Sequence, residues 1–126
     1  MALPKETLEL KGLRGATTTQ SNEIEAIEAS VSELIQELVK RNQLKPEQIV
    51  SITFSVTHDL DACFPAAIAR RQAGWENVAL LDCQQMYVKG DLKNCIRLLA
   101  HVLLPINQPP QHTYLGEAVL LRPDRS

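Results

Sequence analysis

The clearest pattern of apolar positions lies in the first half of the chain, between Ile24 and Val39. Hydrophobic residues recur there at three- and four-residue spacing, which is the period of one face of an α-helix. Asn22 offers an N-cap, and Glu25 follows it three residues later. The pattern predicts a long amphipathic helix that ends near Asn42. The residues at this spacing are Ile24, Ile27, Val31, Leu34, Ile35, Leu38 and Val39.

Two segments on either side of this helix have the character of β-strands. The segment IVSITFSV at 49–56 alternates apolar and small polar residues, which predicts a half-buried strand. Pro46 favours a short helical turn just before it. Near the N-terminus, residues 8–13 predict a first strand that ends in a polar turn at 14–18.

Two shorter elements are expected in the middle of the chain. The segment FPAAIARRQAG at 64–74 predicts a short helix with Pro65 in its first turn and Gly74 at its end. Asp61 is a candidate N-cap for this helix. Residues 75–81 then predict a third strand.

The last part of the chain is expected to contain a helix and a strand. Apolar positions within residues 92–103 recur at helical spacing, which predicts a helix that stops before Pro105 and carries Arg97 in its second turn. A final strand is expected over 113–121, and 86–88 is a candidate for one more strand.

This order of elements predicts an α/β or α+β fold, in which a mixed β-sheet is packed with helices. The chain has 126 residues and is 44% hydrophobic, so residues 1–126 are expected to form one domain with a substantial core. The net charge of -2, the pI near 5.9 and the aromatic content of 4% disfavour a nucleic-acid-binding surface.

The location of the protein is expected to be cytoplasmic. The start of the sequence lacks the charged and apolar regions of a secretion signal, and no apolar run is long enough to span a membrane. The three cysteines include no CxxC pair, which fits a reducing compartment better than a disulfide framework.

His58, Asp59 and Asp61 are the residues most suggestive of a metal site, because imidazole and carboxylate groups bind divalent ions. However, their segment lies where a loop meets a helix, capping accounts for Asp61, and the sequence offers no second ligand cluster. The sequence also contains no GxSxG, GxGxxG or phosphate-loop pattern. We therefore expect neither a metal ion nor a cofactor.

A group of polar residues between 82 and 97 indicates a site. Asp82, Gln84 and Gln85 follow an apolar run, and Arg97 lies among apolar residues further along. An arginine in such surroundings is expected at the edge of the core or at an interface. Guanidinium groups bind carboxylates through paired hydrogen bonds, so cations at element ends are candidates to bind a small polyanion: Arg14, Arg70, Arg97 and Arg122.

Several segments, in the same order along nearly the whole chain, resemble the AroH-class chorismate mutases, the small monofunctional bacterial enzymes. These segments are GLRGATT at 12–18, DLDACFPAAIAR at 59–70, AGW at 73–75, QQM at 84–86, LKNCIR at 92–97 and YLGEAVLLRPD at 114–124. The resemblance implies an α+β fold and a homotrimer that forms a pseudo-barrel, with active sites between subunits. It also implies the conversion of chorismate to prephenate in phenylalanine and tyrosine biosynthesis.

The implied reaction is a Claisen rearrangement that uses no cofactor, metal ion or covalent intermediate. Such a reaction needs the enolpyruvyl arm to be held over the ring and charge to be placed beside the breaking ether bond. By the resemblance, Arg97 is catalytic and reaches the ether oxygen, and Gln85 contacts the ring hydroxyl. The substrate-binding residues it implies are Arg14, Tyr114, Phe64, Arg70, Asp82, Leu121 and Arg122.

Three positions differ from the residues that a member of this family carries. Gln85 stands in place of a glutamate, Ala67 in place of a lysine and Asp82 in place of a cysteine. Asp82 and Gln85 have opposite parity on a regular strand, so Asp82 replaces the missing charge only if the strand bulges or turns.

Two other readings of the sequence remain open at this point. One is a noncatalytic trimer that binds a small dicarboxylate as a sensor or scaffold, its activity lost through Gln85 and Ala67. The other is an imine or enamine hydrolase on a similar trimeric fold, which requires a water-activating group.

Overall fold

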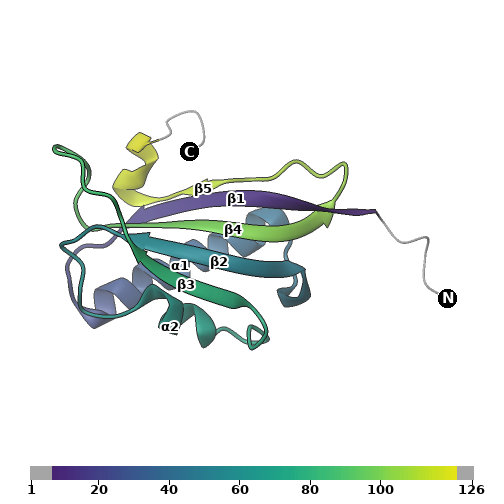
Figure 1. The fold of residues 1–126 in the computed structure, drawn as a ribbon, viewed down its shortest axis with the longest axis horizontal. Helices are drawn as coiled ribbons and strands as arrows, with labels where there is room; N and C mark the ends of the chain where they lie inside the picture. Colours follow the sequence, from purple (N-terminus) through teal and green to yellow (C-terminus); the bar gives the residue numbers. More distant parts are fainter. Residues whose placement is uncertain (1–6, 122–126) are drawn as a thin grey trace.

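The computed structural model describes residues 7–121, which form a five-stranded mixed sheet and two α-helices (Figure 1). The strand order is β3-β2-β4-β1-β5, so β4 lies in the middle of the sheet. It is antiparallel to both β2 and β1, whereas β3 runs parallel to β2 and β5 parallel to β1. The elements along the chain are β1 (Leu8–Thr18), α1 (Ile24–Asn42), the 3₁₀-helix η1 (Pro46–Gln48), β2 (Ile49–Val56), α2 (Pro65–Arg70), β3 (Ala79–Gln84), β4 (Cys95–Pro105), β5 (Thr113–Tyr114) and the 3₁₀-helix η2 (Gly116–Leu121). The predicted α+β fold with a mixed sheet is confirmed.

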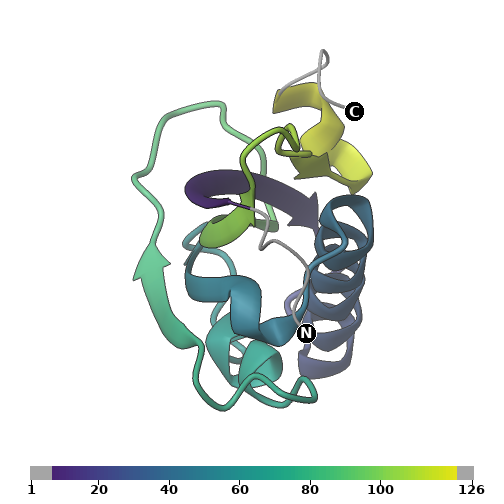
Figure 2. The same cartoon turned by 90° about the vertical axis from the view of Figure 1, so that its right-hand side faces the viewer.

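Helices α1 and α2 lie on the same side of the sheet (Figures 1 and 2). Every second residue of β4 points to that side and is buried, as is Phe54 of β2. These residues pack against the apolar stripe of α1 in one hydrophobic cluster. The stripe consists of Ile27, Val31, Leu34, Ile35 and Leu38. Burial of this layer is the main free-energy gain that holds the helices on the sheet.

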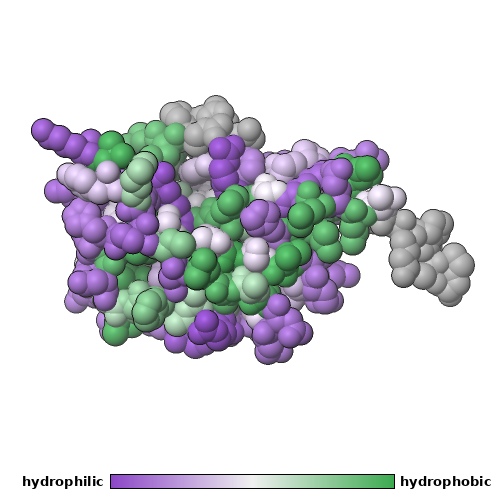
Figure 3. Space-filling view, viewed as in Figure 1, coloured by the Kyte–Doolittle hydropathy of each residue, from purple (hydrophilic) through white to green (hydrophobic). Residues whose placement is uncertain are grey.

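The opposite side of the sheet is covered by neither α-helix. Large apolar side chains are exposed there, with Leu10, Leu81 and Leu99 at 58%, 59% and 43% exposure. Figure 3 shows hydrophobic residues gathered over the middle of this side. An apolar surface of this kind usually marks an interaction site.

The prediction of a helix over 92–103 is wrong, because most of this segment belongs to strand β4, Cys95–Pro105. Apolar residues occur at both even and odd positions of the segment, so both the helical and the strand period fit it. Pairing with β1 on one side and β2 on the other decides in favour of the strand. Arg97 therefore lies on a central strand and its side chain points to the side without helices.

The boundaries of three other predicted strands also change. The first strand does not stop in a polar turn at 14–18 but continues to Thr18, because β1 pairs with β4 along its whole length. The strand expected over 75–81 begins only at Ala79, after the buried Trp75 has packed into the core. The last strand is only Thr113–Tyr114, and 86–88 forms no strand.

Helix α1, strand β2 and the helical turn at Pro46 are found where the sequence predicts them. Neither predicted N-cap is found. Asn22 does not cap α1, and Asp61 does not cap α2. Instead, the two side chains bond each other, and Asn22 Oδ1 also accepts hydrogen bonds from the backbone N–H groups of Asp61 and Ala62. The pair ties the start of α1 to the segment that precedes α2.

Among the described residues, neither helix combines the length and the apolar character that a membrane crossing requires.

The core predicts a large effect of a substitution in α1. Leu34 is fully buried, so Leu34→Ala is expected to lower the free energy of unfolding by about 2–5 kcal/mol, because it leaves a cavity against the sheet. Ile24 lies on the same helix but is 49% exposed, so Ile24→Ala is the matched control and is expected to change stability by less than about 1 kcal/mol. Urea unfolding followed by circular dichroism measures both. Equal losses for the two variants would contradict the assignment of the core.

Candidate active site

The register of the sheet brings Arg97 close to Tyr114. Ala16 of β1 pairs with Arg97 of β4 on one side and with Tyr114 of β5 on the other. Paired residues point to the same side of a sheet, and the small Ala16 leaves space between its two larger neighbours. Arg14 lies two residues away along β1 and points to this side as well.

These residues line a hollow of about 280 Å³ on the side of the sheet without helices. Tyr114 is buried against Ala16 and Ala118, and Leu121 of η2 packs on this small cluster. The lining consists of Arg14, Gly15, Ala16, Arg97, Leu98, Tyr114 and Leu121. Two guanidinium groups, a phenol and an apolar wall thus surround a space of small-molecule size.

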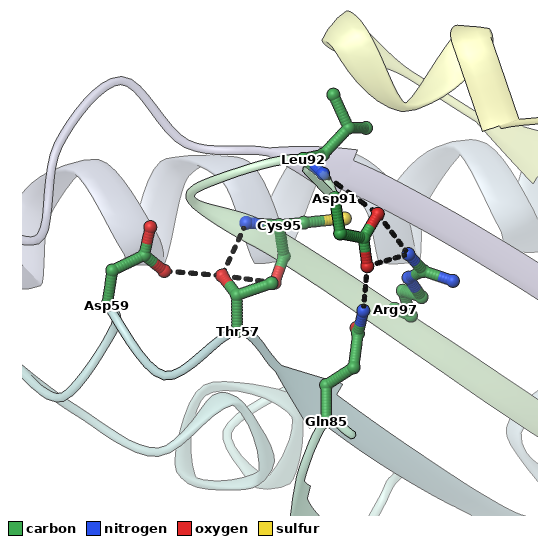
Figure 4. A network of polar contacts seen from close by, with 7 residues as sticks. All are labelled: Thr57, Asp59, Gln85, Asp91, Leu92, Cys95 and Arg97. Carbon is green, nitrogen blue, oxygen red and sulfur yellow. Dashed lines mark hydrogen bonds and ion pairs between the residues drawn. The ribbon is translucent and has the colours of Figure 1, made fainter. Parts of the chain in front are cut away.

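Asp91 and Gln85 lie next to Arg97 in the connection between β3 and β4 (Figure 4). The Arg97 guanidinium donates to both carboxylate oxygens of Asp91, with N–O distances of 3.4 and 3.2 Å. The Gln85 amide Nε2 donates to the same carboxylate at 2.9 Å. Beside them, burial raises the pKa of the Cys95 thiol, an effect that Arg97 only partly offsets.

The segment that carries Asp91 is fastened to the body of the protein. At its start, the Gln85 N–H donates to the carbonyl of Val56 at 2.9 Å. At its end, the Asn94 N–H donates to Asp59 Oδ2, and the Cys95 N–H donates to Thr57 Oγ1. These bonds fix the segment at both ends.

A second hollow, of about 590 Å³, lies between the start of α2 and strand β3. Its lining includes Phe64, Ala67 and Asp82. Asp82 Oδ1 accepts a hydrogen bond from the Ala66 N–H in the first turn of α2, at 3.0 Å. Burial raises the pKa of Asp82, partly offset by this bond and by the charge of Arg70.

The residues predicted for the site fall into separate hollows. Arg14, Arg97, Tyr114 and Leu121 line the first hollow. Gln85 and Asp91 line another hollow of about 350 Å³, and Asp91 joins Gln85 to Arg97. Phe64 and Asp82 line the second hollow, and Arg70 lies within electrostatic reach of Asp82. Arg122 falls outside the described residues.

Within one chain, Asp82 does not replace the charge that Gln85 lacks. Strand β3 pairs with β2 in regular register, so the bulge that this compensation required is not present between 79 and 84. Asp82 consequently points toward α2.

Residues 7–121 contain no cluster of three or more histidine, cysteine, aspartate or glutamate side chains that could hold a metal ion. Asp59 instead accepts hydrogen bonds from Thr57 and Asn94, and Asp61 is paired with Asn22.

Residues 10–125 match the family model of chorismate mutase type I. The chain belongs to this family. It is 39% identical over 118 residues to chorismate mutase AroH of Bacillus subtilis (strain 168), which covers 93% of each chain. It is also 39% identical over 120 residues to chorismate mutase AroH of Thermus thermophilus, covering 91% of this chain and 95% of the relative.

A solved structure agrees with the sequence comparisons. The chorismate mutase from Clostridium thermocellum superposes with a TM-score of 0.81 at 38% identity, covering 87% of this chain and 98% of the other. Membership of the chorismate mutase type I family makes this chain an isomerase. None of these comparisons supports the alternative of a noncatalytic dicarboxylate-binding trimer.

Sequence reasoning missed Asp91 as part of the site. Its position directly after Gly90 was the available signal, because a glycine turn redirects the chain. In the structure, Gly90 has a φ of +84°, and the Asp91 N–H donates to the carbonyl of Val88. This turn directs the Asp91 side chain toward Arg97.

Asp59 makes the free energy of unfolding of this protein depend on pH. Burial alone would raise the pKa of Asp59, but hydrogen bonds from the Thr57 hydroxyl and the Asn94 N–H outweigh burial and lower it. A carboxyl whose pKa falls on folding stabilises the protein above its unfolded-state pKa, and that stabilisation is lost as the pH falls through the folded-state pKa.

Asp59→Asn is therefore expected to lower the free energy of unfolding at pH 7 by about 1 kcal/mol, because one of the two hydrogen bonds is lost. The difference from the original protein is expected to shrink as the pH drops below the ordinary value of 3.8. Urea unfolding at pH 7 and pH 3 measures it. The control is Glu33→Gln on the exposed side of α1, and a pH-independent difference for Asp59→Asn would refute the argument.

Proposed function

We propose that this chain converts chorismate to prephenate with Arg97 and Gln85 as its catalytic residues, in a homotrimer whose sites lie between subunits. The observation that carries this proposal is the hollow in which Arg97, Arg14 and Tyr114 converge on one side of the sheet. Cationic and phenolic donors in one small space suit a substrate with two carboxylates and an ether oxygen.

In the proposed mechanism, the site accelerates the rearrangement by confinement and by placing charge. Arg14 and Tyr114 bind carboxylate oxygens and hold the enolpyruvyl arm over the ring, which removes the entropic cost of reaching the reactive conformation. The Arg97 guanidinium donates to the ether oxygen, where negative charge grows as the C–O bond breaks. The Oε1 atom of Gln85 accepts a hydrogen bond from the ring hydroxyl.

The magnitudes indicate that both contributions are needed. Enzymes at the low end of rate enhancement lower the barrier by about 8 kcal/mol. One well-placed hydrogen-bond donor to a developing negative charge supplies roughly 3–4 kcal/mol. Arg97 alone therefore accounts for less than the whole effect, and the remainder falls to the binding residues.

The homotrimer is supported by the separation of the predicted residues into different hollows. Phe64, Asp82 and Arg70 lie at the β3 side of the molecule, apart from the hollow that contains Arg97. In the proposed assembly, the second hollow of one subunit closes the first hollow of its neighbour. The exposed apolar residues Leu81 and Leu99 provide a surface that such an assembly would bury.

We also propose that the enzyme acts in the cytoplasm. All three cysteines are free, although Cys83 is exposed, and free thiols persist in a reducing compartment.

The catalytic role predicts a large loss of turnover when the guanidinium is removed. Arg97→Ala is expected to lower kcat by at least about a hundredfold, because the growing charge on the ether oxygen loses its donor. The measurement is the loss of chorismate absorbance with time. Arg41→Ala is the matched control, because Arg41 lies on α1 and pairs there with Glu37. Near-normal turnover in Arg97→Ala would contradict the assignment of Arg97 as a catalytic residue.

The shared site predicts that two inactive variants restore activity in a mixed trimer. Arg97→Ala damages the first hollow and Arg70→Ala impairs substrate binding in the second. In a random equal mixture, both halves are intact in about one site in four, so about a quarter of the original activity is expected. Refolding the two variants together and measuring turnover and solution mass tests this. Mixed trimers without recovered activity, or a monomeric mass, would exclude sites shared between subunits.

A further inference from the structure

The carboxylate of Asp91 lies at the centre of the polar contacts that join Gln85, Leu92 and Arg97 (Figure 4). It accepts hydrogen bonds from the Gln85 amide at 2.9 Å, from Arg97 at 3.2 and 3.4 Å, and from the Leu92 N–H at 2.8 Å. The Asp91 and Arg97 side chains are 25% and 35% exposed, so the ion pair is partly shielded from water. Shielding strengthens the interaction relative to a surface pair.

Contact with Asp91 determines which end of the Gln85 amide faces away from it. A carboxylate only accepts hydrogen bonds, so Gln85 must turn its NH₂ group toward Asp91. The carbonyl oxygen Oε1 then points elsewhere, and it is buried with no hydrogen-bond partner among residues 7–121. A buried acceptor without a partner is unfavourable unless a ligand supplies the donor.

Arg97, like Gln85, has a buried polar atom without a hydrogen-bond partner among the described residues. Asp91 engages one terminal nitrogen of the guanidinium, whereas Nε is buried and has no hydrogen-bond partner in the described part of the chain. One carboxylate thus orients two groups, each with one buried polar atom unpartnered. One of these atoms is an acceptor and the other a donor.

We propose that Asp91 is a positioning residue for the rearrangement: it orients the Gln85 amide so that Oε1 accepts from the substrate hydroxyl, and it fixes Arg97 beside the ether oxygen. This inference rests on the proposed function. The negative charge of Asp91 also polarises the Gln85 amide through their shared hydrogen bond, which makes Oε1 a stronger acceptor. The carboxylate of Asp91 therefore does not contact the substrate itself; it is hydrogen-bonded to the Gln85 amide, which does.

The backbone holds Asp91 in place for this role. The turn at Gly90 directs the side chain toward Arg97, and the Leu92 N–H fixes the second carboxylate oxygen. Asp59 and Thr57 fasten the end of the segment three to four residues later. Positioning therefore depends on a short, fastened connection between β3 and β4.

The test moves the carboxylate between positions 91 and 85 and follows kcat and KM separately. Asp91→Asn removes the charge and lets either end of an amide face Gln85, so kcat is expected to fall by roughly tenfold or more, with a smaller change in KM. The double variant Gln85→Glu with Asp91→Asn restores one carboxylate, one hydrogen bond away, and is expected to recover most of the lost kcat. Asp91→Glu is expected to recover part of it.

The single variant Gln85→Glu provides a readout that a structural role would not move. It places two carboxyl groups at hydrogen-bond distance, and mutual repulsion makes such a pair hold its last proton to a higher pH than a lone carboxyl does. The singly protonated pair resembles the original site, so kcat/KM is expected to fall as the pH rises and the second proton leaves. For Asp91→Asn, the matched control is Glu33→Gln on the exposed side of α1, which removes one carboxylate away from the site and is expected to leave kcat unchanged.

Unchanged kcat in Asp91→Asn, or a double variant no more active than Asp91→Asn, overturns the inference while leaving the proposed function intact. Absence of chorismate turnover in the original protein overturns both. Circular dichroism melting of every variant separates misfolding from loss of positioning. If Asp91→Asn is unfolded, the double variant decides: a folded, active double variant supports the inference, and a folded, inactive one overturns it.

Discussion

The pairing of β4 with both β1 and β2 is the constraint on which the rest of the structure depends. Successive residues of the central strand β4 face opposite sides of the sheet. Ile96 and Leu98 lie under the helices, and Arg97 lies on the other side. The register with β1 then sets Arg97 across from Ala16 and close to Tyr114. A shift of one residue would bury the guanidinium in the core, so core packing and placement of the site enforce the same register.

The connection between β3 and β4 adds the second half of the polar chemistry. It has no regular secondary structure, yet its ends are bonded to Val56, Thr57 and Asp59. A loop that carries functional groups must be held by the scaffold, because each misplacement weakens orientation-dependent contacts. Here the sheet supplies Arg97, and the fastened loop supplies the Asp91 carboxylate, which accepts hydrogen bonds from both Arg97 and the Gln85 amide.

Local patterns predicted the elements whose two faces differ. Helix α1 has an apolar stripe and a charged side, and β2 alternates apolar and small polar residues, so their periods are distinct. The segment that becomes β4 carries apolar residues on both of its sides, including Leu99 and Leu103 on the outward side, so its apolar positions fit the helical period as well as the strand period. Its type depends on two partner strands that lie far away in the sequence.

The sequence by itself determined the family, through short segments in order along the chain, and with it the residue types expected in the site. It also determined the long helix and the alternating strand, whose signals lie within a few residues. Only the tertiary structure decided that Arg97 is on a strand, that Asp82 faces α2, and that Asp91 meets Gln85 and Arg97. The physical reason is that these contacts depend on strand register and on one glycine turn, which bring side chains together according to backbone geometry rather than residue type.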